Sequence, residues 1–162
     1  MEFFYLSIVV FLLVLAVFDL FVGVSNDAVN FLNSAIGAKV AKFKTIMLIA
    51  SMGVVVGAVM SAGMMDVARH GIMHPANYSF HEVMTIFLAV MVTDVIILDM
   101  FNTLGLPTST TVSLVFELLG GTFILALLKM NADGNLTFDD LLNSDKALSV
   151  IIAIFVSVAI AF

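Results

Sequence analysis

Long apolar runs constrain this chain more than any other feature of its sequence. Five runs follow one another, at residues 3–22, 45–65, 83–101, 104–128 and 147–162. A helix needs about 20 mainly apolar residues to cross the hydrocarbon core of a bilayer. Charged residues make up 11% of the chain, against about 25% in soluble domains. We therefore predict an all-α fold, a polytopic transmembrane helical bundle.

The remaining composition excludes several functions. The chain has no Cys, which excludes thiol catalysis and cysteine metal sites. Six basic residues and a net charge of −6 leave no electrostatic footprint for nucleic acid. The first run lacks the basic leader of a signal peptide and is longer than the roughly 7–15 residues of its apolar part. We therefore interpret it as a mature transmembrane helix.

The lysines predict an orientation in the membrane. Lys39, Lys42 and Lys44 lie in one short loop, which the positive-inside rule places in the cytoplasm. The N-terminus and residues 66–82 are then outside, as is the linker of residues 129–146 if the fourth run crosses. We expect a multi-pass protein of the plasma (inner) membrane. The last run is short and ends on the final residue, which favours a piece of a longer chain over a naturally short last helix.

The extramembrane segments carry two smaller expectations. The spacing of His70, His74 and His81 fits either solvated loop side chains, which we favour, or a metal site. Thr137 is followed three residues later by Asp140, a spacing that resembles a capping box and predicts the start of a short helix.

A polar segment at residues 23–38 follows the first run. If it is helical, Asn26, Asn30 and Asn33 share one face, with Asp27 beside them. Residues 3–38 would form a helix of about 54 Å, too long for one straight crossing. We therefore predict a break at Gly23, since discontinuous helices build ion and substrate sites in secondary transporters. The alternative is a helix lying at the membrane surface.

A second polar segment, residues 105–111, opens the fourth run. Pro107 favours the first turn of a helix, and the hydroxyl residues Ser109, Thr110 and Thr111 follow it. A helix N-terminus with free N–H groups favours anions. The alternative is an ordinary helix cap whose hydroxyls bind their own backbone.

Three further acids lie in apolar surroundings. Asp94 is well inside the third run, where it is either paired or lines a proton or cation path. Asp99 is near the end of that run, where interfacial water can reach it. The partner of Glu117 is not evident from the sequence. The chain has no Gly-x-Gly-Asp motif, which argues against an intramembrane aspartyl protease.

Together the two polar segments resemble the signatures of the inorganic phosphate transporter family, the phosphate permeases. The first family signature reads approximately Gly-Ala-Asn-Asp-Val-Ala-Asn-x-Phe-Gly-Thr-x-Val-Gly-Ser-Lys, and it is matched in register by Asn26, Asp27, Asn30, Gly37 and Lys39. The later signature reads approximately Gly-x-Pro-Val-Ser-Thr-Thr-His-Ser, and it is matched by Gly105, Pro107, Ser109, Thr110, Thr111 and Ser113. Ala28-Val29 inverts the usual order, and Val112 replaces the family histidine.

The resemblance implies a secondary transporter and not an enzyme. The family is built from two inverted repeats with broken or re-entrant helices, and this chain is similar to the N-terminal repeat. The missing half of the site would come from a second repeat or a second copy. Phosphate is coupled to a sodium ion or a proton, and no other cofactor is implied.

The resemblance also assigns residues. Phosphate would be bound by Asn26, Asp27, Asn30, Ser109, Thr110 and Thr111. The coupling cation would be held by Asn26, Asp27, Asn30 and Thr110. In this scheme the carboxylate of Asp27 accepts a hydrogen bond from the phosphate O–H and balances the cation.

Two other functions stay open. The chain fits a non-transporting membrane interaction module, whose polar faces pair with another subunit. It also fits a transporter of another oxyanion such as sulfate. Sulfate has no O–H for Asp27 to accept, so poor competition by sulfate would favour phosphate.

Overall fold

The chain folds into long helices connected by short segments. The computed structural model describes residues 2–66, 71–132 and 134–161. The helices are α1 (Glu2–Gly37), α2 (Phe43–Val59), α3 (Ala62–Asp66), α4 (Phe80–Leu104), α5 (Thr110–Ala132), α6 (Phe138–Leu141) and α7 (Ser144–Ala161). A single 3-10 turn, Pro75–Asn77, precedes α4. Within the described ranges the β structure is one isolated bridge, between Met73 and Leu142, which confirms the all-α prediction.

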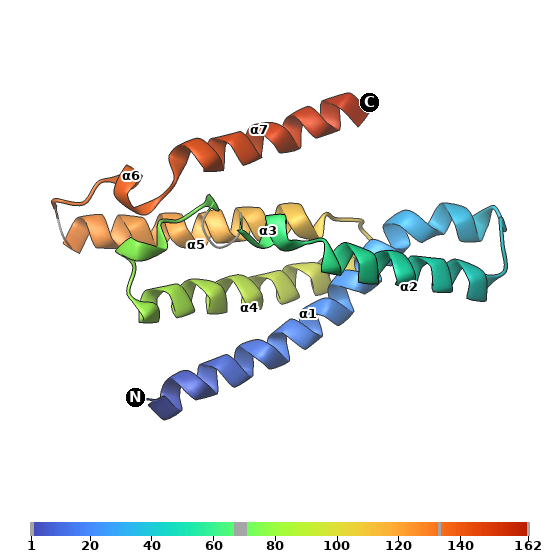
Figure 1. The fold of residues 1–162 in the computed structure, drawn as a ribbon, viewed down its shortest axis with the longest axis horizontal. Coiled ribbons are helices and arrows are strands. Elements are labelled where there is room, and N and C mark those ends of the chain that lie inside the picture. Colours follow the sequence, from blue (N-terminus) through green and yellow to red (C-terminus); the bar gives the residue numbers. More distant parts are fainter. Residues whose placement is uncertain (1, 67–70, 133, 162) are drawn as a thin grey trace.

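The long helices lie roughly along one axis of the molecule (Figure 1). Helix α4 packs against both α1 and α5. In the part of the chain that the structure describes, four helices are long and apolar enough to cross a membrane, in the segments Phe3–Gly37, Phe80–Leu104, Thr110–Ala132 and Ser144–Ala161. The N-terminus, the start of α4 and α6 lie toward one end, and the loop between α1 and α2 lies at the other (Figure 1). The chain is a multi-pass integral membrane protein, and the predicted lysine loop is at the end opposite the N-terminus.

The predicted break at Gly23 is wrong, because α1 is one continuous helix from Glu2 to Gly37. A glycine inside a helix costs only about 1 kcal/mol relative to alanine. Gly23 instead lies where α1 meets its neighbours. A Cβ atom added there would be 3.7 Å from Cγ2 of Thr110 and 3.8 Å from Cδ1 of Leu98. The polar segment is therefore the last part of α1, packed against α4 and the start of α5.

Two other helices end earlier or start later than their apolar runs. Helix α2 ends at Val59, and Met60 and Ser61 separate it from α3. The fourth run was expected to begin at Leu104, but α4 extends to that residue and α5 begins only at Thr110. The expectation that Pro107 opens the helix is therefore wrong. A left-handed residue, Gly105 with φ of 67°, ends α4 and lets the chain turn.

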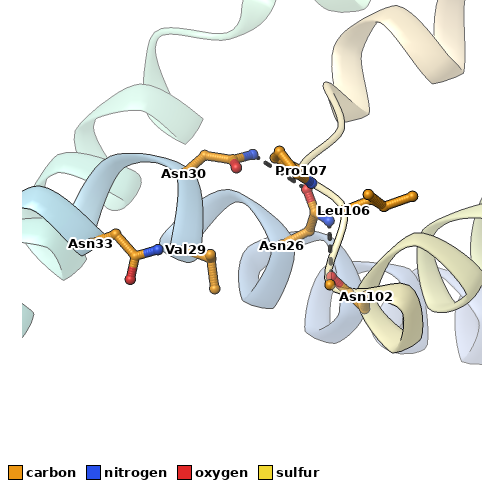
Figure 2. A pocket seen from close by; sticks show the side chains of 8 residues that line it. Asn26, Val29, Asn30, Asn33, Asn102, Leu106 and Pro107 are labelled. Atoms are coloured by element: carbon orange, nitrogen blue, oxygen red, sulfur yellow. Dashed lines mark hydrogen bonds between the residues drawn. The ribbon is translucent and has the colours of Figure 1, made fainter.

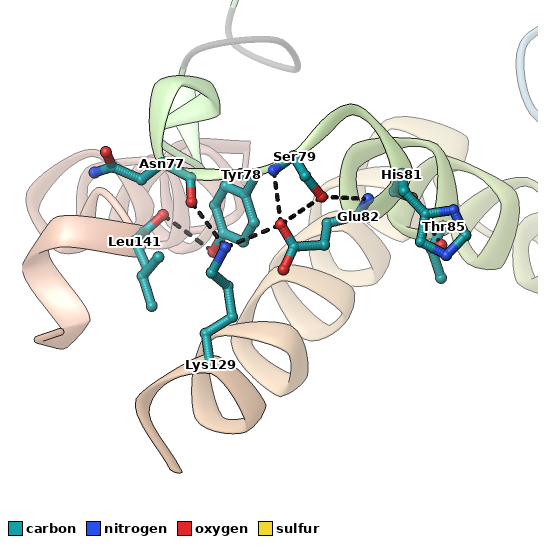
Figure 3. Close-up of polar contacts among 8 residues, drawn as sticks. All are labelled: Asn77, Tyr78, Ser79, His81, Glu82, Thr85, Lys129 and Leu141. Atoms are coloured by element: carbon teal, nitrogen blue, oxygen red, sulfur yellow. Dashed lines mark hydrogen bonds and ion pairs between the residues drawn. The ribbon is translucent and has the colours of Figure 1, made fainter. Parts of the chain in front are cut away.

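A polar clamp holds the end of the bundle where α4 begins (Figure 3). Nζ of Lys129 on α5 lies 2.9 Å from Oε2 of Glu82 on α4 and donates to the carbonyl of Asn77 at 2.9 Å. The same ammonium lies 5.1 Å from the ring centre of Tyr78. The backbone N–H of Glu82 donates to Oγ of Ser79, and the backbone N–H of Ser79 donates back to the Glu82 carboxylate. This capping box fixes the start of α4.

Tyr78 joins the clamp to the apolar core. Its hydroxyl donates to the carbonyl of Leu141 at 3.3 Å. Burial and the nearby Glu82 carboxylate raise the pKa of Tyr78 to about 12. Tyr78 belongs to the buried apolar core, whose other members are Ile72, Met73, Ile86, Val90, Leu118, Ala126 and Leu141.

The capping box predicted in the linker is confirmed. Both the hydroxyl and the backbone N–H of Thr137 donate to Oδ2 of Asp140, at 2.6 Å and 2.9 Å. These bonds, the hydroxyl bond most, hold the pKa of the Asp140 carboxyl below its ordinary value. Helix α6 begins at the next residue, Phe138.

Candidate functional site

The connection between α4 and α5 lies against α1 at the polar end of that helix (Figure 2). Two backbone hydrogen bonds close the end of α4, from N–H of Gly105 to the carbonyl of Asn102 and from N–H of Leu106 to the carbonyl of Phe101. The chain then passes Pro107 and Thr108 before α5 begins. The two predicted polar segments, about 80 residues apart in sequence, are thus neighbours in space.

Asn26 joins these segments. Its side chain is 3% exposed, and its Nδ2 donates to Oδ1 of Asn102 at 2.9 Å. Its Oδ1 accepts from the backbone N–H of Thr108 at 3.4 Å. The amide of Asn102 in turn donates to the carbonyl of Val22 at 3.2 Å. One buried amide therefore contacts both the end of α4 and the connection that follows it.

A cavity of about 320 Å³ opens beside this network. Its volume lies at the small end of the roughly 300–1,000 Å³ of small-molecule sites. Asn30 faces the connection, since its Nδ2 donates to the carbonyl of Thr108 at 3.1 Å. The lining residues are Asn26, Val29, Asn30, Asn33, Asn102, Gly105, Leu106 and Pro107. The polar side chains of this lining are all uncharged amides.

The other predicted site residues lie beside the cavity and do not line it. The hydroxyl of Thr110 on α5 donates to Oδ2 of Asp27 on α1 at 3.3 Å. Oγ of Ser109 accepts from the backbone N–H of Val112 at 3.4 Å, so Ser109 caps α5. Thr111 is exposed. Of the six residues predicted to bind phosphate, two line the cavity and two others pair with each other next to it.

The intramembrane acids differ in their surroundings. Asp94 is 4% exposed, whereas Asp99 is exposed. Glu117 accepts a hydrogen bond from the hydroxyl of Ser113 at 2.8 Å.

The histidine expectation is tested only in part. His70 lies outside the described residues, and His74 and His81 are at the clamp end of the bundle. Within residues 2–66, 71–132 and 134–161, no three His, Cys, Asp or Glu side chains are placed to hold a metal ion.

Asn102 is the lining residue that the sequence reasoning missed. It lies just past the expected end of the third run, three residues before Gly105. An amide side chain so close to the glycine of the second signature was the available signal. Its pairing with Asn26 spans 76 positions, and spacing alone does not reveal such a contact.

Comparison with known proteins decides the family. A sequence profile of the phosphate transporter family matches residues 23–162, which include every residue of the cavity. The chain belongs to the phosphate transporter family. This confirms the resemblance drawn from the two signatures and makes phosphate the transported substrate and the bilayer its setting. No curated protein and no solved structure matches the chain.

Proposed function

We propose that this chain of the phosphate transporter family forms one half of a site for phosphate–cation symport. In this proposal the asparagine amides of the cavity bind phosphate, and Asp27 with Thr110 responds to the coupling cation. The observation that carries it is the cavity itself, which is lined by amides from α1 and α4 and adjoins the start of α5.

The amides suit an anion that must be released again. Each asparagine offers two N–H donors and one acceptor oxygen without a charge. Nδ2 of Asn30 donates to Oδ1 of Asn26 over 3.4 Å, near the outer limit of a hydrogen bond. That donor can turn to a phosphate oxygen at little cost. The N-terminus of α5, which is the positive end of its helix dipole, lies at the same place.

Asp27 gives this site its dependence on a cation. An anion beside an unpaired carboxylate in a site of low dielectric is strongly unfavourable. A sodium ion or proton at the Asp27–Thr110 pair removes that repulsion. The carboxylate can also accept the phosphate O–H. Phosphate and cation therefore favour each other's binding.

The remaining half of the site would come from an inverted second repeat or from a second copy of this chain. One repeat rocking against the other would open the cavity to each side of the membrane in turn. We place the protein in the plasma (inner) membrane with its N-terminus outside, because of the lysines between α1 and α2.

Uptake of radiolabelled phosphate tests the proposal, in cells whose own copy of the gene carries each substitution. Asp27→Asn should abolish cation-driven uptake, and Asn30→Ala should raise the phosphate KM about tenfold, as expected for the loss of a hydrogen bond to a charged ligand. Ser25→Ala is the matched control on α1, because the Ser25 hydroxyl donates to the carbonyl of Phe21 on its own helix.

Three results contradict the proposal. Near-normal uptake by Asp27→Asn removes the coupling role of that carboxylate. Strong competition by sulfate favours a transporter of another oxyanion, because sulfate lacks the O–H. Uptake by the wild type that shows no saturable dependence on phosphate favours the interaction module.

A further inference from the structure

Three carboxyl groups from three helices meet in the apolar part of the bundle. We call them the carboxyl cluster: Asp19 on α1, Asp94 on α4 and Glu117 on α5. The Asp94 carboxyl is close enough to the Asp19 carboxyl, the Ser113 hydroxyl and the Glu117 carboxyl to interact with each of them. The Ser113 hydroxyl also donates to Glu117 at 2.8 Å.

The cluster contains oxygen atoms that no protein group satisfies. Asp94 is 4% exposed. Oδ1 of Asp19, Oδ1 of Asp94 and Oε2 of Glu117 are buried, and none has a hydrogen-bond partner among the described residues. A buried ionised carboxylate without a partner costs several kcal/mol. Two or three of them within interaction distance cannot all stay charged.

No described basic residue compensates the cluster. On the helices packed together here, Lys129 pairs with Glu82 at the clamp end. Asp27 is bonded to Thr110, and Asp99 is exposed. The charged residue of α2 is a lysine at its first turn, beside the loop at the far end of α1. The described residues therefore leave the cluster uncompensated, and a bound proton would relieve its charge.

The position of the cluster relates it to the cavity. On α1, Asp19 is eight residues before Asp27; on α4, Asp94 is eight residues before Asn102. On α5, which runs antiparallel to α4 (Figure 1), the acid instead follows the site residue, with Glu117 seven residues after Thr110. At 1.5 Å per residue, each acid is about 10–12 Å along its helix from the residue named with it, which lies in or beside the cavity. All three displacements point toward the end of the bundle that carries the N-terminus.

From this juxtaposition we propose that the carboxyl cluster is a proton site of the transporter, loaded and unloaded in each cycle. This rests on the proposed function, and it selects a proton over a sodium ion as a coupling cation. A proton shared between Asp19 and Asp94 satisfies two bare oxygens at once. A metal ion fits less well, because the described residues contain no group of three acids or histidines arranged to hold one.

Transport in membrane vesicles tests the inference, with the protein at its native length. A gradient of about two pH units, acid on the side of added phosphate, supports about a hundredfold accumulation for one coupled proton. We expect Asp94→Asn to lose this accumulation while phosphate–phosphate exchange at equal pH is retained, because the neutral Asn side chain resembles the protonated carboxyl. Asp99→Asn, an exposed acid on the same helix, is the matched control and should keep both activities.

The outcomes separate the inference from the proposed function. Accumulation retained by Asp94→Asn overturns the proton site, and so does a wild type driven by a sodium gradient but not by a pH gradient. In both cases phosphate symport itself stands. Absence of phosphate exchange in the wild type overturns the proposed function instead.

A second measurement tests the inference if Asp94→Asn loses every transport activity. The infrared carbonyl band of a buried protonated carboxyl should be present in the wild type, change with pH and weaken in Asp94→Asn. A wild type without such a band overturns the inference.

Discussion

The hydrogen bonds of Asn26 set how firmly the α4–α5 connection is held against α1. Asn26→Leu keeps the branched shape and the number of side-chain heavy atoms but removes all three bonds, at 2.9 Å to Asn102 and at 3.4 Å from Thr108 and from Asn30. Side-chain hydrogen bonds in membrane proteins average about 0.6 kcal/mol and reach about 1.7 kcal/mol. We assign about 1 kcal/mol to the short bond and about 0.5 kcal/mol to each long one, which predicts a loss of about 2 kcal/mol.

Thiol labelling can measure this loss in the membrane. The chain has no Cys, so Val22→Cys introduces a single thiol on α1, at a position that is 8% exposed in the wild type. When opening is rapid and reversible, the labelling rate reports the fraction of molecules in which α1 is undocked. A loss of about 2 kcal/mol corresponds to labelling about 30-fold faster.

Ser25→Ala serves as the control for the labelling experiment. Ser25→Ala removes a hydrogen bond inside α1 and leaves the contact between helices intact, so it should change labelling by no more than about twofold. If Asn26→Leu accelerates labelling by less than about threefold, apolar packing alone holds the connection. The hydrogen-bond network would then not position the cavity.

Two further predictions concern Tyr78 and Gly105. The difference in tyrosinate absorbance between wild type and Tyr78→Phe should titrate with a midpoint at about 12, readable because the chain has two Tyr and no Trp. This raised pKa contributes stability that is complete below pH 10 and lost as pH rises toward 12; a midpoint near 10 contradicts the burial argument. Gly105→Ala should accelerate labelling of the same thiol about tenfold, because a left-handed residue with a Cβ costs about 1–2 kcal/mol. Gly120→Ala, at a helical glycine with open space around it, should not accelerate labelling, and equal effects of the two substitutions would exclude the backbone argument.

Local sequence patterns predicted the long helices and three of the four amides that line the cavity. The spacing of Asn26 and Asn30 places them one turn apart on any helix, so their shared face did not depend on the tertiary fold. The Thr137–Asp140 box was equally local. The break at Gly23 was inferred from length alone, and length does not decide whether a helix continues past its expected crossing.

Contacts between helices were beyond these patterns. The pairing of Asn26 with Asn102 and the meeting of Asp94 with Asp19 depend on how α1 rotates against α4. Apolar periodicity fixes such rotation poorly when lipid surrounds the bundle, because lipid tails are as apolar as the helices. The acids could be recognised as unusual from the sequence, but their convergence could not.

The chemistry of the cavity lining bears on why transport would need a cation. Among the described residues, the polar side chains that line this cavity are all amides, and none is Lys, Arg or His. The carboxylate of Asp27, which accepts a hydrogen bond from Thr110 beside the cavity, would repel a phosphate there. A fixed lysine would bind phosphate whether or not a cation was present, and uptake would then be uncoupled from any gradient. With amides in the cavity and carboxyls beside and beyond it, the proposed function makes tight binding of phosphate depend on the added positive charge. Replacing Asn33 at the cavity wall by Lys should therefore raise phosphate affinity while weakening its dependence on the cation, and a variant whose dependence is unchanged would show that the coupling arises elsewhere.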